Sequence, residues 1–331
     1  MSDNIREIPD RLDRPFITFM KSWEVLLVVV ATGVFIFNSL ASPHFLDVWT
    51  LSDMTFNFTE KALIALPLAL LIIAGEIDLS VAATLALSST LMGFAVRFGF
   101  GPAILVFIGV VTGLACGAFN GLLITGLNLP SIVVTIGTLS LFRGLAFVIL
   151  GDQVYKNYPA GFEYFGQGYV VSVISFELVL FLISAVIFGF TLHFTSFGRR
   201  LYFIGRNPVA SLFSGVNVKR TKFILFCLTG AMSGLASVLL TSRLGSTRPS
   251  IAQGYELEAI TMVVLGGVAI TGGAGTIMGV VLGALIMGLV TFGFGLINVP
   301  GIVLSIFVGL LLIAVIAIPI LWSRFVWISK K

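Results

Sequence analysis

The sequence predicts an all-α transmembrane protein with about ten helices and an inverted internal repeat. The first observation is composition, since 58% of the 331 residues are hydrophobic and only 10% are charged, whereas soluble domains carry about 25% charged residues. The second is a series of apolar runs, each near the roughly 20 residues that a spanning helix needs. The third is a pair of sequence blocks that resemble one another.

Short connections join the apolar runs, so there is no room for a soluble catalytic domain. The first 22 residues are polar and no small-residue cleavage site follows the first run, which we therefore expect to be a retained helix. The expected organisation is a cytoplasmic segment at 1–22, one transmembrane domain at 23–322 and a cytoplasmic tail at 323–331. The ten predicted spans are 23–42, 53–75, 79–98, 102–126, 131–150, 172–194, 221–242, 256–272, 274–296 and 300–322.

Basic residues predict the orientation, because cytoplasmic loops hold an excess of Lys and Arg. With the N-terminus inside, residues 1–22, the loop 195–222 and the tail together hold thirteen of the nineteen Lys and Arg residues. Both termini are therefore expected in the cytoplasm.

The internal repeat can be seen by eye. Gly121-Leu-Leu-Ile-Thr-Gly126 reappears as Gly283-Ala-Leu-Ile-Met-Gly288, and Leu127-Asn-Leu-Pro-Ser-Ile-Val133 matches Ile297-Asn-Val-Pro-Gly-Ile-Val303. A ladder of glycines four residues apart leads into each copy, and such ladders also let membrane helices pack closely. The ladders are Gly113, Gly117, Gly121 and Gly275, Gly279, Gly283.

The repeat has an architectural consequence. Its copies cover about 53–150 and 221–322, and the copied helices are five spans apart. Because five is odd, the second copy is inverted in the membrane. Inverted repeats recur in transporters, with the pathway at the repeat interface and alternating access by rocking of the halves.

Several kinds of chemistry have no support in the sequence. Cys116 and Cys227 lie in apolar runs and the two histidines, His44 and His193, are far apart, so we expect neither a disulfide framework nor a metal site. No segment matches the phosphate-binding Gly-x-x-x-x-Gly-Lys-Ser/Thr loop. The net charge of +4 reflects basic loops and does not indicate nucleic-acid binding.

The longest predicted cytoplasmic loop contains a short helix with clear ends. Asn207 followed by Pro208 is a good helix start, and Gly215 is a good stop. A short capped helix on the cytoplasmic face suits docking of another subunit. A basic helix anchored to lipid head groups has the same signature.

With this loop, four further motifs resemble the permease subunit of bacterial ABC importers for monosaccharides. The ribose permease is a familiar member, and the autoinducer-2 and rhamnose permeases are relatives. The resemblance covers roughly residues 23–322 and implies a ten-span inverted-repeat fold of the vitamin B12 importer type, in the inner membrane of a bacterium. The motifs are Gly75-Glu-Ile-Asp-Leu-Ser80, Leu129-Pro-Ser-Ile-Val-Val-Thr-Ile-Gly-Thr138, Gly254-Tyr-Glu-Leu-Glu-Ala-Ile-Thr-Met-Val-Val-Leu-Gly-Gly267 and Gly272-Gly-Ala-Gly-Thr-Ile-Met-Gly279.

The resemblance also implies partners. They are a cytoplasmic ATP-binding subunit, a periplasmic sugar-binding protein and a second permease, either another copy or a paralogue. The chain is then not an enzyme and holds no cofactor, since ATP is bound by the partner. The resemblance makes the loop a coupling helix that docks on the ATPase, with the residues Gly205, Asn207, Pro208, Ala210, Ser214 and Gly215.

Four polar residues are candidates for the translocation pathway. Asp78 lies at a break between two apolar runs, where Asp78 or Ser80 can instead only cap the next helix. Thr135 and Thr138 are expected either to face a polar passage or to bond the backbone of their own helix. Asn57 is expected either to face the passage or to form a hydrogen bond to another helix. The pairs Gly266-Gly267 and Gly272-Gly273 predict a further break around the eighth and ninth spans.

Charged residues near the outside suggest two further roles. Glu256 and Glu258 open the eighth span beside the outside loop that contains Arg243 and Arg248. We expect these four either to pair with one another or to dock the sugar-binding protein. Arg143 lies within the fifth span, where its charge needs a polar partner or must snorkel to the surface.

One other class of function competes with the importer. A self-contained sugar symporter or facilitator uses the same inverted-repeat logic, but a proton-driven version needs ionisable groups buried in mid-span. The carboxylates are all expected near span ends or breaks, which favours the importer. Within the monosaccharides, residues 43–57 look closer to rhamnose permeases than to ribose permeases.

Overall fold

The computed structural model describes residues 23–151 and 153–328. Over these residues the chain forms helices almost throughout, with one two-stranded hairpin. Seven of the described helices are long and apolar enough to cross a membrane, which confirms the all-α transmembrane class. The predicted segment 1–22 lies outside the described residues, as do residues 329–331 of the predicted tail.

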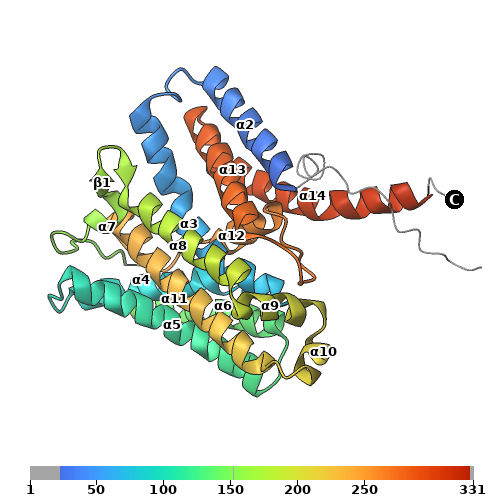
Figure 1. The fold of residues 1–331 in the computed structure, drawn as a ribbon. Helices are drawn as coiled ribbons and strands as arrows, with labels where there is room; N and C mark the ends of the chain where they lie inside the picture. Colours follow the sequence, from blue (N-terminus) through green and yellow to red (C-terminus); the bar gives the residue numbers. More distant parts are fainter. Residues whose placement is uncertain (1–22, 152, 329–331) are drawn as a thin grey trace, which may run out of the picture.

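The elements follow one another in three groups (Figure 1). The first group is α2 (Trp23–Ala41), α3 (Val48–Ile73), α4 (Val81–Val96), α5 (Pro102–Gly126) and α6 (Ser131–Leu150). The middle group is α7 (Tyr164–Gln167), β1 (Tyr169–Val171), β2 (Ile174–Ser175), α8 (Phe176–Phe194), α9 (Ser196–Arg206) and α10 (Pro208–Phe213). The last group is α11 (Val218–Leu244), α12 (Tyr255–Leu265), α13 (Ile277–Leu296) and α14 (Gly301–Ile328).

Several predicted spans differ from the observed elements, and three of the differences change how the chain is divided. The predicted span 256–272 is wrong as one helix, because α12 ends at Leu265 and residues 266–276 form a loop. That loop contains both glycine pairs and connects α12 to α13, which fits a break as well as a turn between two helices. The predicted span 172–194 begins with a hairpin strand, and helix starts only at Phe176. The last span is longer than predicted, since α14 continues to Ile328 and includes the start of the predicted tail.

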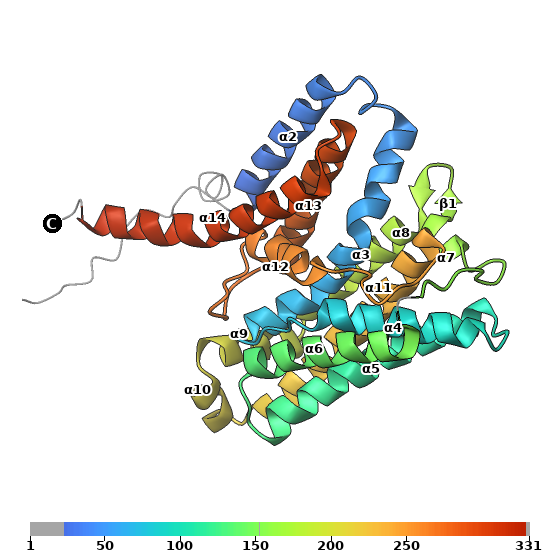
Figure 2. The same cartoon turned by 180° about the vertical axis from the view of Figure 1, so that it is seen from behind.

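The helix α3 forms the centre of the fold. From Phe58 to Ile73 every residue is buried, and α8, α11, α12 and α13 all pack on this helix. By contrast, α2, α5, α6 and α8 leave most of their residues exposed or only partly buried, as helices in contact with lipid do. The two views in Figures 1 and 2 show α3 passing between the α2–α13 pair and the group of α4, α5, α6 and α11.

The predicted glycine ladders are sites of close helix packing. A Cβ at Gly113 would overlap the carbonyl oxygen of Gly230, and one at Gly117 would overlap that of Phe226, so α5 and α11 touch backbone to backbone. In the second ladder, Gly279 packs in the same way on Gly266 at the end of α12. Small residues at helix crossings permit this approach.

The two predicted halves have related helix orders and contacts. The sequence of long, short, long and long helices in α3–α6 returns in α11–α14. The third helix of each half packs on the first helix of the other half, since α5 packs on α11 and α13 packs on α3. The corresponding residues Asn128 and Asn298 both adopt the left-handed conformation, with φ of 55° and 56°. The inverted relation of the two copies itself stays a prediction.

Candidate functional site

The predicted coupling helix is present as α10. The side chain of Asn207 accepts a hydrogen bond from the backbone N–H of Ala210 at 2.9 Å, Pro208 is the first helical residue, and Gly215 ends the segment with φ +81°. Asn207, Pro208, Ala210, Ser214 and Gly215 are all exposed. These five residues therefore form an accessible surface that another protein can contact.

The sixth predicted coupling residue, Gly205, faces the other way. It lies in the last turn of α9, and a Cβ there would overlap the carbonyl oxygen of Ile73. The helix α9 is amphipathic, with Leu201 and Ile204 buried against the transmembrane core. Gly205 is thus packed against the end of α3 and only partly exposed, and its docking role stays a prediction.

The same helix is anchored through a tyrosine. The hydroxyl of Tyr202 donates a hydrogen bond to the carbonyl oxygen of Gly275 at 2.7 Å. Burial raises the pKa of the Tyr202 hydroxyl, because a buried phenolate would lose its hydration. The protonated hydroxyl remains available as the donor that this contact requires.

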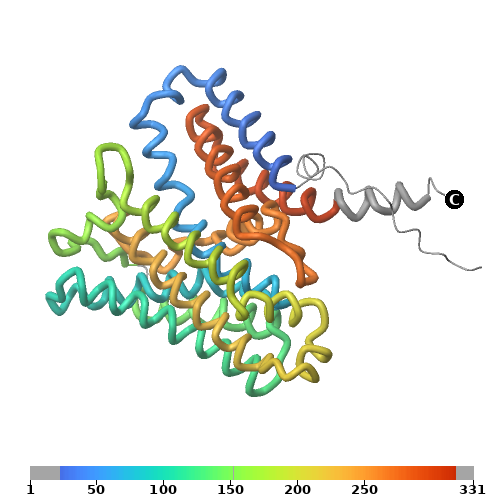
Figure 3. The backbone as a smooth tube through the Cα atoms, in the orientation of Figure 1, coloured from blue at the N-terminus to red at the C-terminus, as the bar shows by residue number. Residues whose placement is uncertain are grey.

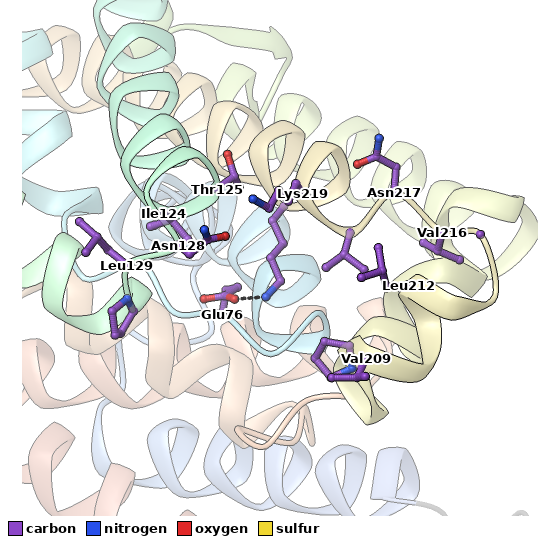
Figure 4. A pocket seen from close by; sticks show the side chains of 15 residues that line it. Glu76, Ile124, Thr125, Asn128, Leu129, Val209, Leu212, Val216, Asn217 and Lys219 are labelled. Atoms are coloured by element: carbon purple, nitrogen blue, oxygen red, sulfur yellow. Dashed lines mark hydrogen bonds and ion pairs between the residues drawn. The ribbon is translucent and has the colours of Figure 1, made fainter.

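A cavity of about 710 Å³ lies beside α10. Figure 4 shows the side chains of Val209 and Leu212 on one side of it and those of Ile124, Asn128 and Leu129 on another. The cavity is therefore bounded by α10, by the end of α5 and by the connection to α6. Inside it, the ammonium group of Lys222 from α11 pairs with the carboxylate of Glu76.

A buried polar cluster occupies the break between α3 and α4. The carboxylate of Asp78 accepts hydrogen bonds from the backbone N–H of Ser80 at 2.8 Å and from its hydroxyl at 2.6 Å. The amide of Asn120 on α5 donates to the Ser80 hydroxyl at 2.8 Å. Asp78 is 2% exposed and the other two are fully buried. The cluster therefore fixes the chain at the break. The expected capping is not observed, because α4 begins after Ser80 without a side-chain cap and Asp78 binds Ser80 itself.

The four predicted pathway residues do not form one site. Thr135 on α6 lies next to the break, with its hydroxyl 3.5 Å from the carbonyl oxygen of Ile77, but it also reaches the carbonyl of its own helix. Thr138 bonds only the backbone of α6 among the described residues. Asn57 bonds Asp53 of its own helix, and the expected hydrogen bond to another helix is not observed in the described part of the chain. It lies about 24 Å along α3 from Ile73, at 1.5 Å per residue. The structure thus brings Asp78 and Thr135 together and leaves Asn57 apart.

Two ion pairs connect α3 to the second half of the chain. Arg243 at the end of α11 binds both carboxylate oxygens of Glu60, at 2.8 and 3.0 Å. Lys61 pairs with Glu258 on α12 at 2.6 Å and lies over the ring of Tyr255, 4.6 Å from its centroid. Bidentate Arg–carboxylate pairs are strong and geometrically specific. These contacts fasten α3 to α11 and to α12 at one level of the fold.

A third carboxylate lies close to these pairs without a partner. Glu177, in the first turn of α8, is fully buried, and neither of its oxygens has a hydrogen-bond partner among the described residues. An ionised carboxylate in such surroundings is very costly unless it is paired. Within the part of the chain that the structure describes, Glu177 is thus the buried carboxylate with neither oxygen satisfied.

The predicted docking residues have different surroundings from those expected. The expected mutual pairing is wrong for Arg243 and Glu258, which bind Glu60 and Lys61 instead. Glu256 is partly buried, and one of its oxygens lacks a partner within the described part of the chain. Arg248 is exposed and so is the one of these four that keeps a free surface position.

Arg143 finds protein partners, and the expectation of snorkelling is wrong. Its guanidinium donates to the carbonyl oxygens of Pro249 and Ile251 at 2.8 and 2.6 Å. Both carbonyls belong to the loop between α11 and α12. Arg143 therefore ties α6 to that loop.

Sequence reasoning missed the roles of Glu60, Lys61, Glu177 and Lys222. Glu60 was expected near a span end, but α3 starts at Val48 and places it at the middle of a 26-residue helix. The signal available was the presence of both charge signs inside predicted apolar spans, since buried charges are expensive unless paired. The spacing along the chain could not identify the partners. Among the described residues there is no group of three or more metal-ligating side chains.

Comparison with known proteins points to one family. Residues 50–316 match the family described as the branched-chain amino acid transport system permease component. No solved structure matches the chain.

Three relatives are import permeases for ribose, autoinducer 2 and fructose. The ribose import permease protein of Bacillus subtilis is 38% identical over 265 residues, covering 79% of this chain and 81% of the relative. The autoinducer 2 import system permease protein of Salmonella typhimurium is 32% identical over 301 residues, covering 89% and 90%. The fructose import permease protein of Rhizobium meliloti is 31% identical over 308 residues, covering 91% and 85%.

Proposed function

The chain belongs to this family of transport-system permease components, and from that membership we propose that it is the membrane-spanning subunit of an ATP-driven monosaccharide importer. The sugar crosses the inner membrane by alternating access between the two halves. The observation that carries the proposal is the similarity over most of the chain to permeases for ribose, autoinducer 2 and fructose.

The exposed helix α10 supports the coupling part of the proposal. Its ends are fixed by the Asn207 cap and by Gly215, and its outer surface is free for contact. A rigid, short helix transmits a push better than a flexible loop does. We assign to it the docking of a cytoplasmic ATP-binding subunit, with Asn207, Pro208, Ala210, Ser214 and Gly215 at the interface.

The remaining partners follow from the same assignment. A periplasmic sugar-binding protein delivers the substrate, with the exposed Arg248 as part of its landing surface. A second permease, a copy or a paralogue, completes the membrane unit. Rhamnose is the substrate that residues 43–57 favour, whereas the relatives act on other substrates, so competition between rhamnose, ribose and fructose in uptake assays decides among them.

The competing function is a self-contained symporter or facilitator. The sequence argument against a proton-driven symporter was that no carboxylate lies in mid-span, and Glu60 removes that argument. However, Arg243 pairs with the Glu60 carboxylate. Purification from the native membrane in mild detergent, followed by mass spectrometry, tests the choice. Recovery of an ATP-binding subunit supports the importer. Sugar flux into vesicles that contain this chain alone would contradict it.

A further inference from the structure

Three segments that are far apart in sequence meet backbone to backbone beside α10. They are Gly75 in the break after α3, Gly205 in the last turn of α9, and Gly272 in the loop between α12 and α13. A Cβ at Gly272 would lie 3.1 Å from the Cα atoms of both Gly205 and Gly75. We call this contact the glycine junction. Figure 3 shows the orange loop before α13 next to the yellow end of α9.

Hydrogen bonds fasten the glycine junction from both sides. The backbone N–H of Gly273 donates to the carbonyl oxygen of Ile73 at 2.8 Å, which joins the loop to the end of α3. The hydroxyl of Tyr202 holds the carbonyl of Gly275 from α9. Gly272 has φ +84°, a conformation that favours glycine. Space thus excludes a side chain at Gly205, and backbone conformation disfavours one at Gly75 and Gly272.

An ion pair makes a second connection to the break between α3 and α4, this time from the chain that follows α10. Lys222 lies in the second turn of α11, directly after the segment that follows α10, and pairs with Glu76 next to Gly75. The two side chains are largely buried, with 18% and 11% of their surfaces exposed. Burial shields such a pair from salt and makes the loss of one partner costly.

The chain on both sides of α10 is therefore fixed to the break before α4, through Gly205 and through Lys222. On the α9 side it is also fixed to the loop after α12. The break lies just before α4, which has 16 residues, and the loop lies just after α12, which has 11. A displacement of α10 must move both connections, because closely packed interiors transmit strain.

We propose that motion of α10 reaches the translocation pathway through the glycine junction and the Glu76–Lys222 ion pair, so that α4 and α12 move together with the coupling helix. This inference rests on the proposed function. Glu76 and Lys222 are positioning residues in it, since they need not touch the sugar.

The test uses the assembled importer in proteoliposomes, with its ATP-binding subunit and sugar-binding protein. Assembly, ATP hydrolysis and sugar uptake are measured for each variant. Lys222→Met and Glu76→Gln should assemble and hydrolyse ATP but lose uptake by about tenfold, a typical size for coupling between sites. The charge swap Glu76→Lys with Lys222→Glu should recover uptake. Lys219→Met is the control, because Lys219 is exposed and lines the same cavity.

A second measurement is independent of the ion pair. Spin labels on the exposed residues Ser214 and Thr271 should keep their mutual distance when ATP binds, while each changes its distance to a label on Leu122 of α5. A change between Ser214 and Thr271 would overturn the inference, because the coupling helix and the loop would then move separately.

The outcomes separate this inference from the proposed function. If the unaltered complex shows no ATP-dependent uptake, the proposed function fails. If the unaltered complex works and Lys222→Met transports normally, the inference fails alone. Parallel loss of hydrolysis and uptake also overturns it, since the pair would then serve assembly or docking. The inference is also overturned if the charge-swapped double variant folds and assembles but does not recover uptake.

Discussion

Glu60 and Arg243 form a two-point ion pair, with distances of 2.8 and 3.0 Å, between the middle of α3 and the last turn of α11. Glu60 is fully buried, and the two residues are 183 positions apart. We expect Glu60→Gln to destabilise the protein by about 3–5 kcal/mol, because it leaves a buried guanidinium without its charge partner. Thermal unfolding in detergent measures the loss.

A matched change at Glu177 should have the opposite outcome. Glu177→Gln removes the same charge from an equally buried position, but here the carboxylate has no partner among the described residues to lose. We expect the unfolding free energy to stay within about 1 kcal/mol of the original or to rise, since an unsatisfied buried group is itself costly. A loss as large as that of Glu60→Gln would mean that Glu177 has a partner in the folded protein.

The crossing of α5 and α11 should tolerate no side chain. Gly113→Leu would drive a side chain into the backbone of Gly230, and overpacking of this kind costs about 1–3 kcal/mol or more. We expect a lower unfolding temperature and less protein in the membrane. Gly33→Leu on α2 is the control, because nothing lies within 4 Å of a Cβ at that position, and its unfolding temperature should not change.

Arg143 should determine the order of the loop between α11 and α12. Arg143→Met removes two donors, and their charged hydrogen bonds to the carbonyls of Pro249 and Ile251 contribute about 1.5–3 kcal/mol each. Hydrogen exchange or limited proteolysis should show faster opening of residues 245–254. Unchanged exchange in this loop would contradict the role assigned to the arginine.

The outer surface of α10 should separate docking from folding. Pro208→Asp changes an exposed first-turn residue, where an acidic side chain is compatible with the helix. We expect normal folding and membrane insertion but weaker binding of the ATP-binding subunit and reduced uptake. Gly205→Arg, by contrast, should lower the amount of folded protein, because Ile73 leaves no space for it. Equal behaviour of the two variants would contradict their assignment to opposite faces.

Local chemistry made part of the structure predictable. The helix α10 could be located because Asn207, Pro208 and Gly215 act on their immediate neighbours in the chain. The glycine ladders likewise predicted close helix crossings, because a glycine lets any neighbouring helix approach its backbone closely. The all-α transmembrane class followed from the composition together with the length of the apolar runs.

Other features depended on contacts that spacing does not encode. The end of α12 was placed too late because Val268, Ala269 and Ile270 continue the apolar run, although they belong to a loop. The partners of Arg243 and Glu258 were misassigned to residues nearby in sequence, whereas the actual partners lie on α3. Whether a charge lies in mid-span depends on where its helix begins, and α3 begins five residues before the predicted start.

The length of α12 has a consequence for how the protein enters the membrane. Its 11 residues span about 16 Å at 1.5 Å each, roughly half of the 30 Å hydrocarbon core. During synthesis α12 cannot leave the insertion machinery alone as a stable transmembrane segment. We therefore expect α12 to insert together with α13, on which it packs, as one helical hairpin that then packs on α3.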